Sequence, residues 1–330
     1  GQAALVASAA PLYTTSGPPT AFETAAGGVF DGVGDLVIDN RTRCSGSLLG
    51  TGAHVLTAAH CLTDGTGSLT ANRATVYFAG DNGAYAAEAA GFNVHPQWNG
   101  NLLRGYDVGV LELDARLDPE IRRYELYTDA DGDARTVEAL GAISGKVGYG
   151  RGGTGDTGAT LVSGTKRDGR NVYDDVVDTM YAALGGAPSG YLADSILQYD
   201  FDNGTAANDA FGLFLGQSGT GVANEVMSAP GDSGGPTFLD GRIAGITSYG
   251  LRLAFSGGSS SDIDTALNSS YGEFGGDTRV SRFADWITAQ TGVTAVSAPG
   301  GLALVLLGLG VLSITGGSGA LIPGCAAACR

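Results

Sequence analysis

Short apolar runs alternate with glycine-rich turns along most of the chain. Each run has five or six residues and is rich in Val, Ile, Leu, Tyr and Phe, which is the length and composition of a β-strand. The pattern therefore predicts an all-β body, built as a sandwich or as a pair of barrels. The runs span residues 46–50, 54–58, 75–79, 108–113, 195–199 and 243–248.

One segment, 278–290, has a helical period instead. Its apolar residues recur at intervals of three and four positions, and Thr278 or Ser281 can cap its start. We expect a C-terminal helix that closes the domain. Two further stretches, 145–169 and 256–276, show neither period and are predicted to form extended surface loops.

The composition supports a folded, turn-rich protein and excludes one class of partner. The 330 residues include 56 Gly and 10 Pro, which is below the content typical of disordered chains. With 18 Lys and Arg against 34 Asp and Glu, the formal net charge is −16. A field of this sign repels phosphate backbones, so we expect no nucleic-acid partner.

The N-terminal end differs from the body of the chain. Residues 1–10 resemble the remnant of an export signal, because Ala7, Ser8 and Ala9 form the kind of small-residue box that a signal peptidase cleaves. The alternative is a flexible mature N-terminus. A separate N-terminal segment, 11–28, leads into the domain.

Residues 291–330 form a hydrophobic tail whose last residue is its only charged one. The apolar run 302–312 reaches a spanning length of about 20 residues only if the glycines after it are included. The segment from Val296 resembles the PEP-CTERM type of bacterial sorting tail, with Ser-Ala-Pro in place of the Pro-Glu-Pro signature. The resemblance implies sorting or membrane anchoring, and the alternative is a tail that docks on the domain. Cys325 and Cys329 could carry lipid or have no role.

The sequence offers no ligand set for a transition metal. Its three His and four Cys contain neither a Cys-x-x-Cys nor a His-Glu-x-x-His spacing, so we predict no metal and no other cofactor. Two acidic stretches, 129–133 and 200–204, resemble the start of calcium loops, but their glycines fall at the wrong offset and no Glu closes either loop. We expect solvated acidic turns there, with structural calcium as the alternative.

Three blocks of sequence carry residues that suit nucleophilic catalysis. They are centred on His60, Asp107 and Ser233, in that order along the chain. A serine hydroxyl is a weak nucleophile at neutral pH, so it needs an imidazole to accept its proton and a carboxylate to hold the imidazole. We predict that Ser233 is the nucleophile, His60 the general base and Asp107 the residue that orients His60.

The glycines around Ser233 indicate an oxyanion hole. Gly231 allows the backbone to turn so that its N–H and that of Ser233 point to one place. Two such donors stabilise the charge that develops on the carbonyl oxygen in the tetrahedral intermediate. We therefore predict that Gly231 and Ser233 form this hole.

The blocks Thr-Ala-Ala-His-Cys, Tyr-Asp-Val-Gly-Val and Gly-Asp-Ser-Gly-Gly-Pro resemble those of the trypsin-like serine proteases of the chymotrypsin fold. The likeness spans residues 29–290, which we take as the protease domain. It implies an all-β fold of two packed antiparallel β-barrels with a C-terminal helix, and a triad in the cleft between the barrels. It also implies a disulfide between Cys44 and Cys61, beside His60.

The resemblance also assigns contacts with substrate. Ser248 would touch the triad carboxylate, and the two residues after it would hold a peptide as an added strand. Met227 would form the uncharged floor of the primary specificity pocket, which favours an apolar or medium-sized side chain. The substrate-binding residues expected on this basis are Met227, Ser228, Ser248, Tyr249, Gly250 and Gly275.

One feature of the family is absent from the sequence. Family members bury a freed Ile-Val-Gly-Gly terminus against the aspartate before the catalytic serine, here Asp232, and no such tetrapeptide is present. An unpaired buried carboxylate would cost several kcal/mol. We therefore predict that Asp232 has another partner.

These features together predict an exported serine endopeptidase of a bacterial envelope or exterior. It would hydrolyse peptide bonds of protein or peptide substrates through a covalent acyl-enzyme. We expect a monomeric catalytic domain, secreted or transiently anchored by a tail that contacts the membrane or the sorting machinery. Two alternatives remain, a catalytically silent surface binding protein on the same fold and an esterase.

Overall fold

The computed structural model describes residues 4–8, 14–80, 82–128, 140–219, 221–254 and 260–297. The chain divides after Ala298 into two units. The second unit, which holds most of the predicted tail and both of its cysteines, lies outside the described residues, as does the acidic stretch 129–133. Among the residues described, no helix has both the length and the hydrophobicity needed to cross a bilayer.

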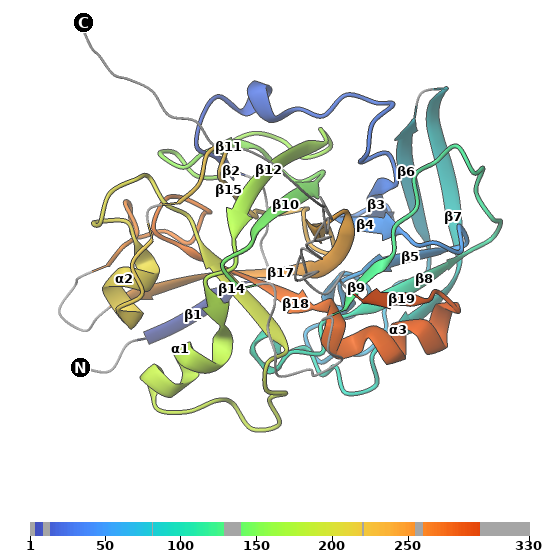
Figure 1. Cartoon of the computed structure of the whole chain (residues 1–330). Helices are drawn as coiled ribbons and strands as arrows, with labels where there is room; N and C mark the ends of the chain where they lie inside the picture. Colours follow the sequence, from blue (N-terminus) through green and yellow to red (C-terminus); the bar gives the residue numbers. More distant parts are fainter. Residues whose placement is uncertain are drawn as a thin grey trace, which may run out of the picture. The chain divides into compact units, whose positions relative to one another are not determined.

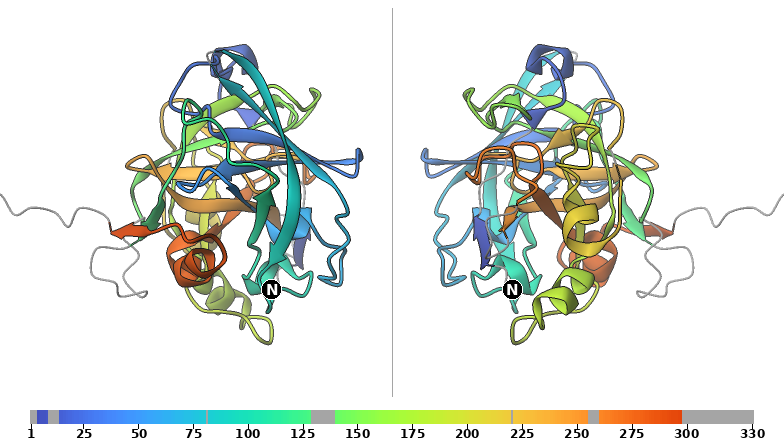
Figure 2. Two further views of the ribbon diagram at one scale, coloured as in Figure 1. Left: turned by 90° about the vertical axis from the view of Figure 1, so that its right-hand side faces the viewer. Right: turned by 90° about the vertical axis from the view of Figure 1, so that its left-hand side faces the viewer.

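Six antiparallel strands of the N-terminal half close into a barrel. They are β3 (Val33–Ile38), β4 (Thr42–Leu48), β5 (His54–Thr57), β6 (Ala74–Gly80), β7 (Gly83–Val94) and β8 (Gly109–Leu113). Their order around the barrel is β3-β4-β5-β8-β7-β6. Leu36, Val55 and Val76 fill the interior and are fully buried. The paired strands β6 and β7 form a long hairpin, coloured light blue to teal (Figure 2).

The C-terminal half is built on an open ten-stranded sheet. Its main strands are β10 (Ile143–Gly148), β12 (Arg167–Val172), β13 (Asp175–Val176), β14 (Ile196–Asp200), β16 (Pro236–Leu239), β17 (Arg242–Ala254) and β18 (Phe274–Arg279). They run in the order β12-β10-β16-β17-β18-β14-β13, with β1 (Ala4–Ser8), β9 (Leu126–Thr128) and β19 (Ala295–Ser297) attached at the side. Figure 1 shows β17 and β18 in the centre, with the barrel strands to their right.

A third, small sheet ties the N-terminal segment to the body. Its strands are β11 (Gly153–Thr154), β2 (Thr14–Thr15) and β15 (Val226–Met227), with β2 in the middle. One apolar core joins the barrel to the second half, since Phe238, Ile243 and Ile246 pack in the same cluster as the barrel interior. The predicted all-β fold with two β systems is confirmed, and the second system is an open half-barrel in the part of the chain described.

The helices are short. They are α1 (Val177–Leu184), α2 (Ala210–Leu215) and α3 (Ala284–Thr291), with 3₁₀ turns η1 (Pro19–Phe22), η2 (Ala59–Cys61), η3 (Leu102–Arg104) and η4 (Val280–Phe283). The expected C-terminal helix is present as α3, but its predicted start at residue 278 is wrong. Thr278 belongs to β18, where it pairs with Ile196 and Ile246, so neither Thr278 nor Ser281 caps α3.

The prediction of an extended loop over 145–169 is also wrong in part. Most of β10 and the start of β12 lie within it and pair with each other, with Lys146 opposite Gly169. The charged side chain of Lys146 points inward and is fully buried, so the strand lacks the apolar alternation by which strands are recognised. Likewise, the predicted loop 256–276 ends earlier than expected, because β18 begins at Phe274.

Candidate active site

The strand pairing of the barrel brings His60 and Asp107 together. β5 and β8 are neighbours, with Thr57 opposite Gly109, so the chain just after β5 meets the chain just before β8. His60 lies on η2, and the predicted disulfide between Cys44 and Cys61 is confirmed and ties η2 to β4. Ser233 stands in the turn between β15 and β16, and its carbonyl accepts the N–H of Ser45 on β4 at 2.8 Å.

The three side chains form a continuous chain of hydrogen bonds. His60 Nε2 lies 2.7 Å from Ser233 Oγ, and His60 Nδ1 lies 2.7 Å from Asp107 Oδ2. An ionised carboxylate only accepts hydrogen bonds, so Nδ1 carries the proton of a neutral imidazole. Nε2 is then free to accept the hydroxyl proton of Ser233, which is the arrangement that a general base requires.

Asp107 is held on several sides and is fully buried. Its Oδ1 accepts the backbone N–H of His60 at 2.9 Å, and its Oδ2 accepts the hydroxyl of Ser248 at 2.6 Å. Its own carbonyl accepts the hydroxyl of Thr278 at 3.0 Å, a contact that the sequence did not reveal. These bonds fix the carboxylate, and with it the plane of the imidazole.

The turn around Ser233 differs from residue to residue in how its backbone N–H groups are bonded. The N–H groups of Asp232, Gly234 and Gly235 are each bonded to a backbone carbonyl. Those of Gly231 and Ser233 have no acceptor among the residues described. Gly231 has φ +109, and a Cβ there would come within 2.9 Å of the Cα of Gly150. The position therefore requires glycine, and the two N–H groups remain available to an oxyanion.

Asp232 has partners, as predicted. The residue is fully buried. Its Oδ1 accepts the N–H of Gly150 at 2.9 Å, and its Oδ2 accepts that of Ala229 at 3.4 Å. Backbone donors thus stabilise the carboxylate in the absence of the Ile-Val-Gly-Gly terminus.

Lys146 is a fully buried charged-type residue that sequence reasoning missed. Lys146 Nζ donates to Asp277 Oδ2 at 2.6 Å and to Thr237 Oγ1 at 2.9 Å. It also lies 3.7 Å from the ring centroid of Tyr199. Burial lowers the pKa of Lys146, and the charge of Asp277 opposes that shift. A lysine in a glycine-rich stretch gives no sequence signal for such a position.

An aromatic ring lies among the residues expected to line the specificity pocket. Met227 and Ser228 are fully buried, and the hydroxyl of Tyr199 donates to Ser228 Oγ at 2.7 Å. The same ring lies against Gly275, where an added Cβ would come within 2.1 Å of it. The ring of Tyr199 therefore occupies the space between Ser228 and Gly275, two residues that the resemblance places around the pocket. The sequence did not point to Tyr199, because the contact depends on the pairing of β14 with β18.

The resemblance predicts that a substrate pairs with one edge of β17. In the structure, β1 of the same chain already pairs with β17 there. β1 pairs with it in antiparallel fashion, from Ser8 opposite Gly250 to Ala4 opposite Ala254. On its other side Gly250 pairs with Gly275 of β18. Tyr249 is fully buried, and its ring lies against Gly276. Tyr249 and Gly250 are the two residues expected to hold a substrate strand. Gly250 is thus already paired with a strand on each side.

The structure also places a further histidine and two groups of possible metal ligands. His95 stacks on Tyr106 and packs near Phe283 and Trp286, and burial lowers its pKa. In the part of the chain that the structure describes, His60 lies close to the two half-cystines, but the sulfurs of Cys44 and Cys61 are already bonded to each other. An all-oxygen group of Asp200, Asp202 and Asp209 also occurs in the described residues.

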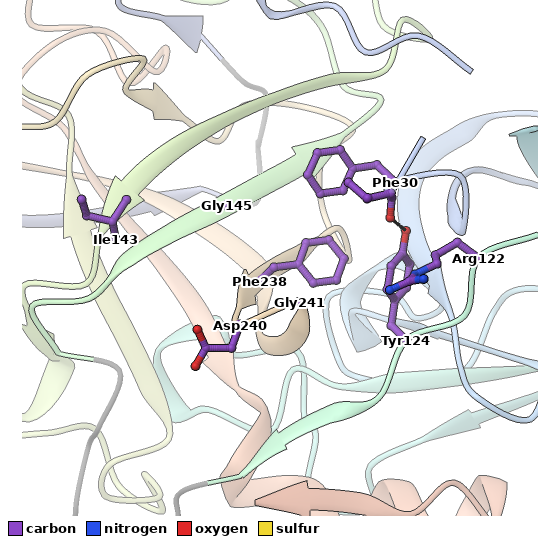
Figure 3. A pocket seen from close by; sticks show the side chains of 9 residues that line it. Phe30, Arg122, Tyr124, Ile143, Gly145, Phe238, Asp240 and Gly241 are labelled. Carbon is purple, nitrogen blue, oxygen red and sulfur yellow. Dashed lines mark hydrogen bonds between the residues drawn. The ribbon is translucent and has the colours of Figure 1, made fainter. Parts of the chain in front are cut away.

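A hollow of about 390 Å³ lies where the barrel meets the second sheet (Figure 3). The ring of Phe238 faces Phe30 and Tyr124 there, with centroid distances of 5.8 and 4.7 Å. None of the predicted catalytic or substrate-binding residues lines this hollow. The hollow is therefore lined by other residues than those of the triad.

Comparisons with known proteins support the family and the fold. The family model described as Trypsin matches residues 24–189, which is half of the chain and includes His60 and Asp107. Among solved structures, one titled HL collagenase is similar, with a TM-score of 0.54 and 18% sequence identity. That match covers 83% of this chain and 98% of the other chain. At this level of identity the likeness concerns the fold.

Proposed function

This chain belongs to the trypsin family of serine peptidases, and we propose that it is an endopeptidase that acts through Ser233, His60 and Asp107. The observation that carries the proposal is the hydrogen-bonded series from Asp107 through His60 to Ser233, with both bonds at 2.7 Å. This series joins Ser233 of the second half to His60 and Asp107 of the barrel half. The side chain of His60 is 16% exposed, so the series reaches the surface.

The reaction follows the chemistry of these groups. Ser233 Oγ attacks the scissile carbonyl while His60 Nε2 takes the hydroxyl proton, and the N–H groups of Gly231 and Ser233 hold the oxyanion. The imidazolium, held by Asp107, then gives the proton to the leaving amine as the C–N bond breaks. The acyl group remains bonded to Ser233 Oγ as an ester. Water attacks this acyl-enzyme with His60 again as base, which releases the acid and restores the hydroxyl.

The disulfide supports the proposal that the protein resides outside the cytoplasm. Bonds such as that between Cys44 and Cys61 persist in oxidising compartments, so the trypsin-like domain is consistent with export. We propose secretion or residence in the cell envelope on this basis.

Assays on matched substrates distinguish the proposed activity from its alternatives. We expect the purified chain to hydrolyse peptide amides and to react with a fluorophosphonate probe. An esterase would cleave simple esters but leave peptide amides intact. A silent binding protein would do neither, and either of these results would refute the proposal.

From the position of Tyr199 we predict that few side chains are accepted before the scissile bond. With its ring between Ser228 and Gly275, only a small side chain such as that of Ala fits before the scissile bond. Tyr199→Ala should raise cleavage after Phe relative to cleavage after Ala by about 10²-fold. The same change should lower the free energy of unfolding by about 3–5 kcal/mol, because it empties a buried aromatic site. A peptide library read by mass spectrometry measures the first effect.

Tyr199→Phe is the matched control, since it keeps the ring and removes only the hydroxyl. It should leave the size preference unchanged. A wild-type profile dominated by Phe, Arg or Lys before the scissile bond would show that the ring does not close the pocket.

The pairing of β1 with β17 predicts competition with substrate. A strand edge pairs with one strand at a time, so a bound peptide must displace residues 4–8 from Gly250 onward. A chain without residues 1–8 should therefore show a KM for peptides about 10-fold lower, with little change in kcat. A chain in which Gly and Ser replace these residues at equal length is the control and should behave like the truncated one. An unchanged KM in both would mean that β1 does not compete.

A further inference from the structure

Acidic side chains gather where β14 ends and the chain enters α2. Asp200 is the last residue of β14, Asp209 precedes α2, and Asp202 lies in the loop between them. Each of the three offers one carboxylate oxygen, these oxygens lie within 4.8 Å of one another, and all three residues are buried. The sequence prediction of solvated acidic turns at 200–204 is therefore wrong for Asp200 and Asp202.

Two more carboxylates lie close to this group. Glu225 accepts the N–H of Asp202 at 2.9 Å, and its charge, like that of Asp174, acts on Asp202. No Lys or Arg of the described residues forms an ion pair with any of the five. Without a cation, this concentration of negative charge is unfavourable.

Asp202 differs from Asp200 and Asp209 in the hydrogen bonds that its carboxylate accepts. Asp200 Oδ2 accepts the N–H groups of Ala210 and Phe211, at 2.7 and 3.0 Å. Asp209 is likewise held by two backbone N–H groups, at 2.6 and 3.2 Å. Asp202 is only 6% exposed, yet its Oδ1 has no donor among the residues described. A buried carboxylate oxygen without a donor is rare in native proteins and points to a ligand.

We propose that Asp200, Asp202 and Asp209 bind a calcium ion. Carboxylate oxygens are the preferred ligands of hard cations, and calcium accepts the irregular arrangements that a loop and a helix start provide. Magnesium favours strict octahedral geometry and retains most of its water, which suits a buried site of several carboxylates less well. The ion would join the end of β14 to the start of α2, and through Glu225 to the segment that leads into Met227 and Ser228.

Thermal unfolding of the full chain tests this site. Ser233→Ala is used as the background, so that self-digestion cannot imitate a loss of stability and the result does not depend on the proposed activity. After removal of metal with EDTA, calcium at about 1 mM should raise the Tm by about 5 °C, and magnesium at the same concentration should raise it by much less. Calorimetric titration with calcium should show one site per chain.

Asp202→Asn, made in the same background, tests the location. Without calcium its Tm should equal or exceed that of the parent, because one of several like charges is removed. With calcium its response should need at least about 10-fold more metal. Asp114→Asn makes the same charge change at an exposed position in the barrel half and should keep the full response.

Three results would overturn the proposal. The first is a Tm that neither EDTA nor calcium changes, and the second is a magnesium response as large as that to calcium. The third is a calcium response in Asp202→Asn equal to that of Asp114→Asn. Each can be read without any assay of peptide hydrolysis.

Discussion

Ser233→Ala is expected to lower kcat/KM for a peptide amide by about 10⁶-fold. The hydroxyl is the attacking group, and no other oxygen of the described residues lies 2.7 Å from His60 Nε2. His60→Ala should cost about as much, since the hydroxyl then has no base. Because the two residues act as one unit, the double variant should be hardly worse than either single one.

The control for this series is Ser68→Ala, which removes the hydroxyl of an exposed serine in a loop. It should retain full activity. Steady-state kinetics with one peptide amide, together with a Tm for each variant, provide the comparison. Additive losses in the double variant would mean that Ser233 and His60 do not act in one step.

Asp107→Asn should lower kcat by about 10⁴-fold while the fold persists. The carboxylate only accepts, so it holds the proton on Nδ1 and leaves Nε2 as the base. An amide at the same position can donate to Nδ1, which favours the tautomer with its proton on Nε2. That imidazole cannot take the proton of Ser233, although all the heavy atoms remain in place.

Ser248→Ala is the matched comparison for Asp107→Asn. It removes one of the donors to Asp107 Oδ2 but leaves the charge and both bonds of His60. Its effect on kcat should be about 10-fold, in line with the loss of one hydrogen bond to a charged group. If both variants lost activity equally, the tautomer argument would fail. A Tm near that of the wild type in each would exclude unfolding as the cause.

The residues of the triad and of the predicted oxyanion hole could be proposed from the sequence because each lies in a short local motif. His60 lies beside Cys61, and Gly231 and Ser233 share one short motif whose residues serve the same turn. Four of the six barrel strands, β4, β5, β6 and β8, overlap apolar runs that the sequence predicted as strands, whereas β3 and β7 were not predicted. The order of the three blocks then indicated the fold that brings them together.

The rest depends on contacts between distant strands. Tyr199 meets Ser228 and Gly275 only because β14 pairs with β18, and Lys146 is buried only because β10 lies between β12 and β16. Neither register can be read from one run of sequence. The acidic loop 200–204 is a similar case, since its exposure depends on how the chain around α2 packs.

The helices show the limit of periodicity. Thr278 and Ser281 match a helix cap, yet the pairing of β18 extends through Thr278 and delays the start of α3 to Ala284. α1 and α2 have eight and six residues, too few for a helical period to be distinguished from a strand. Tertiary pairing thus decides where each of these elements begins.

The most direct test of this account is to locate the adduct formed by a fluorophosphonate probe. The full chain and the chain without residues 1–8 are treated with the probe, digested and analysed by mass spectrometry. We expect one phosphonylated residue, Ser233, with faster labelling in the shorter chain and none after Ser233→Ala. An adduct on any other residue, or no adduct in either folded chain, would contradict the assignment of Ser233 as the nucleophile activated by His60.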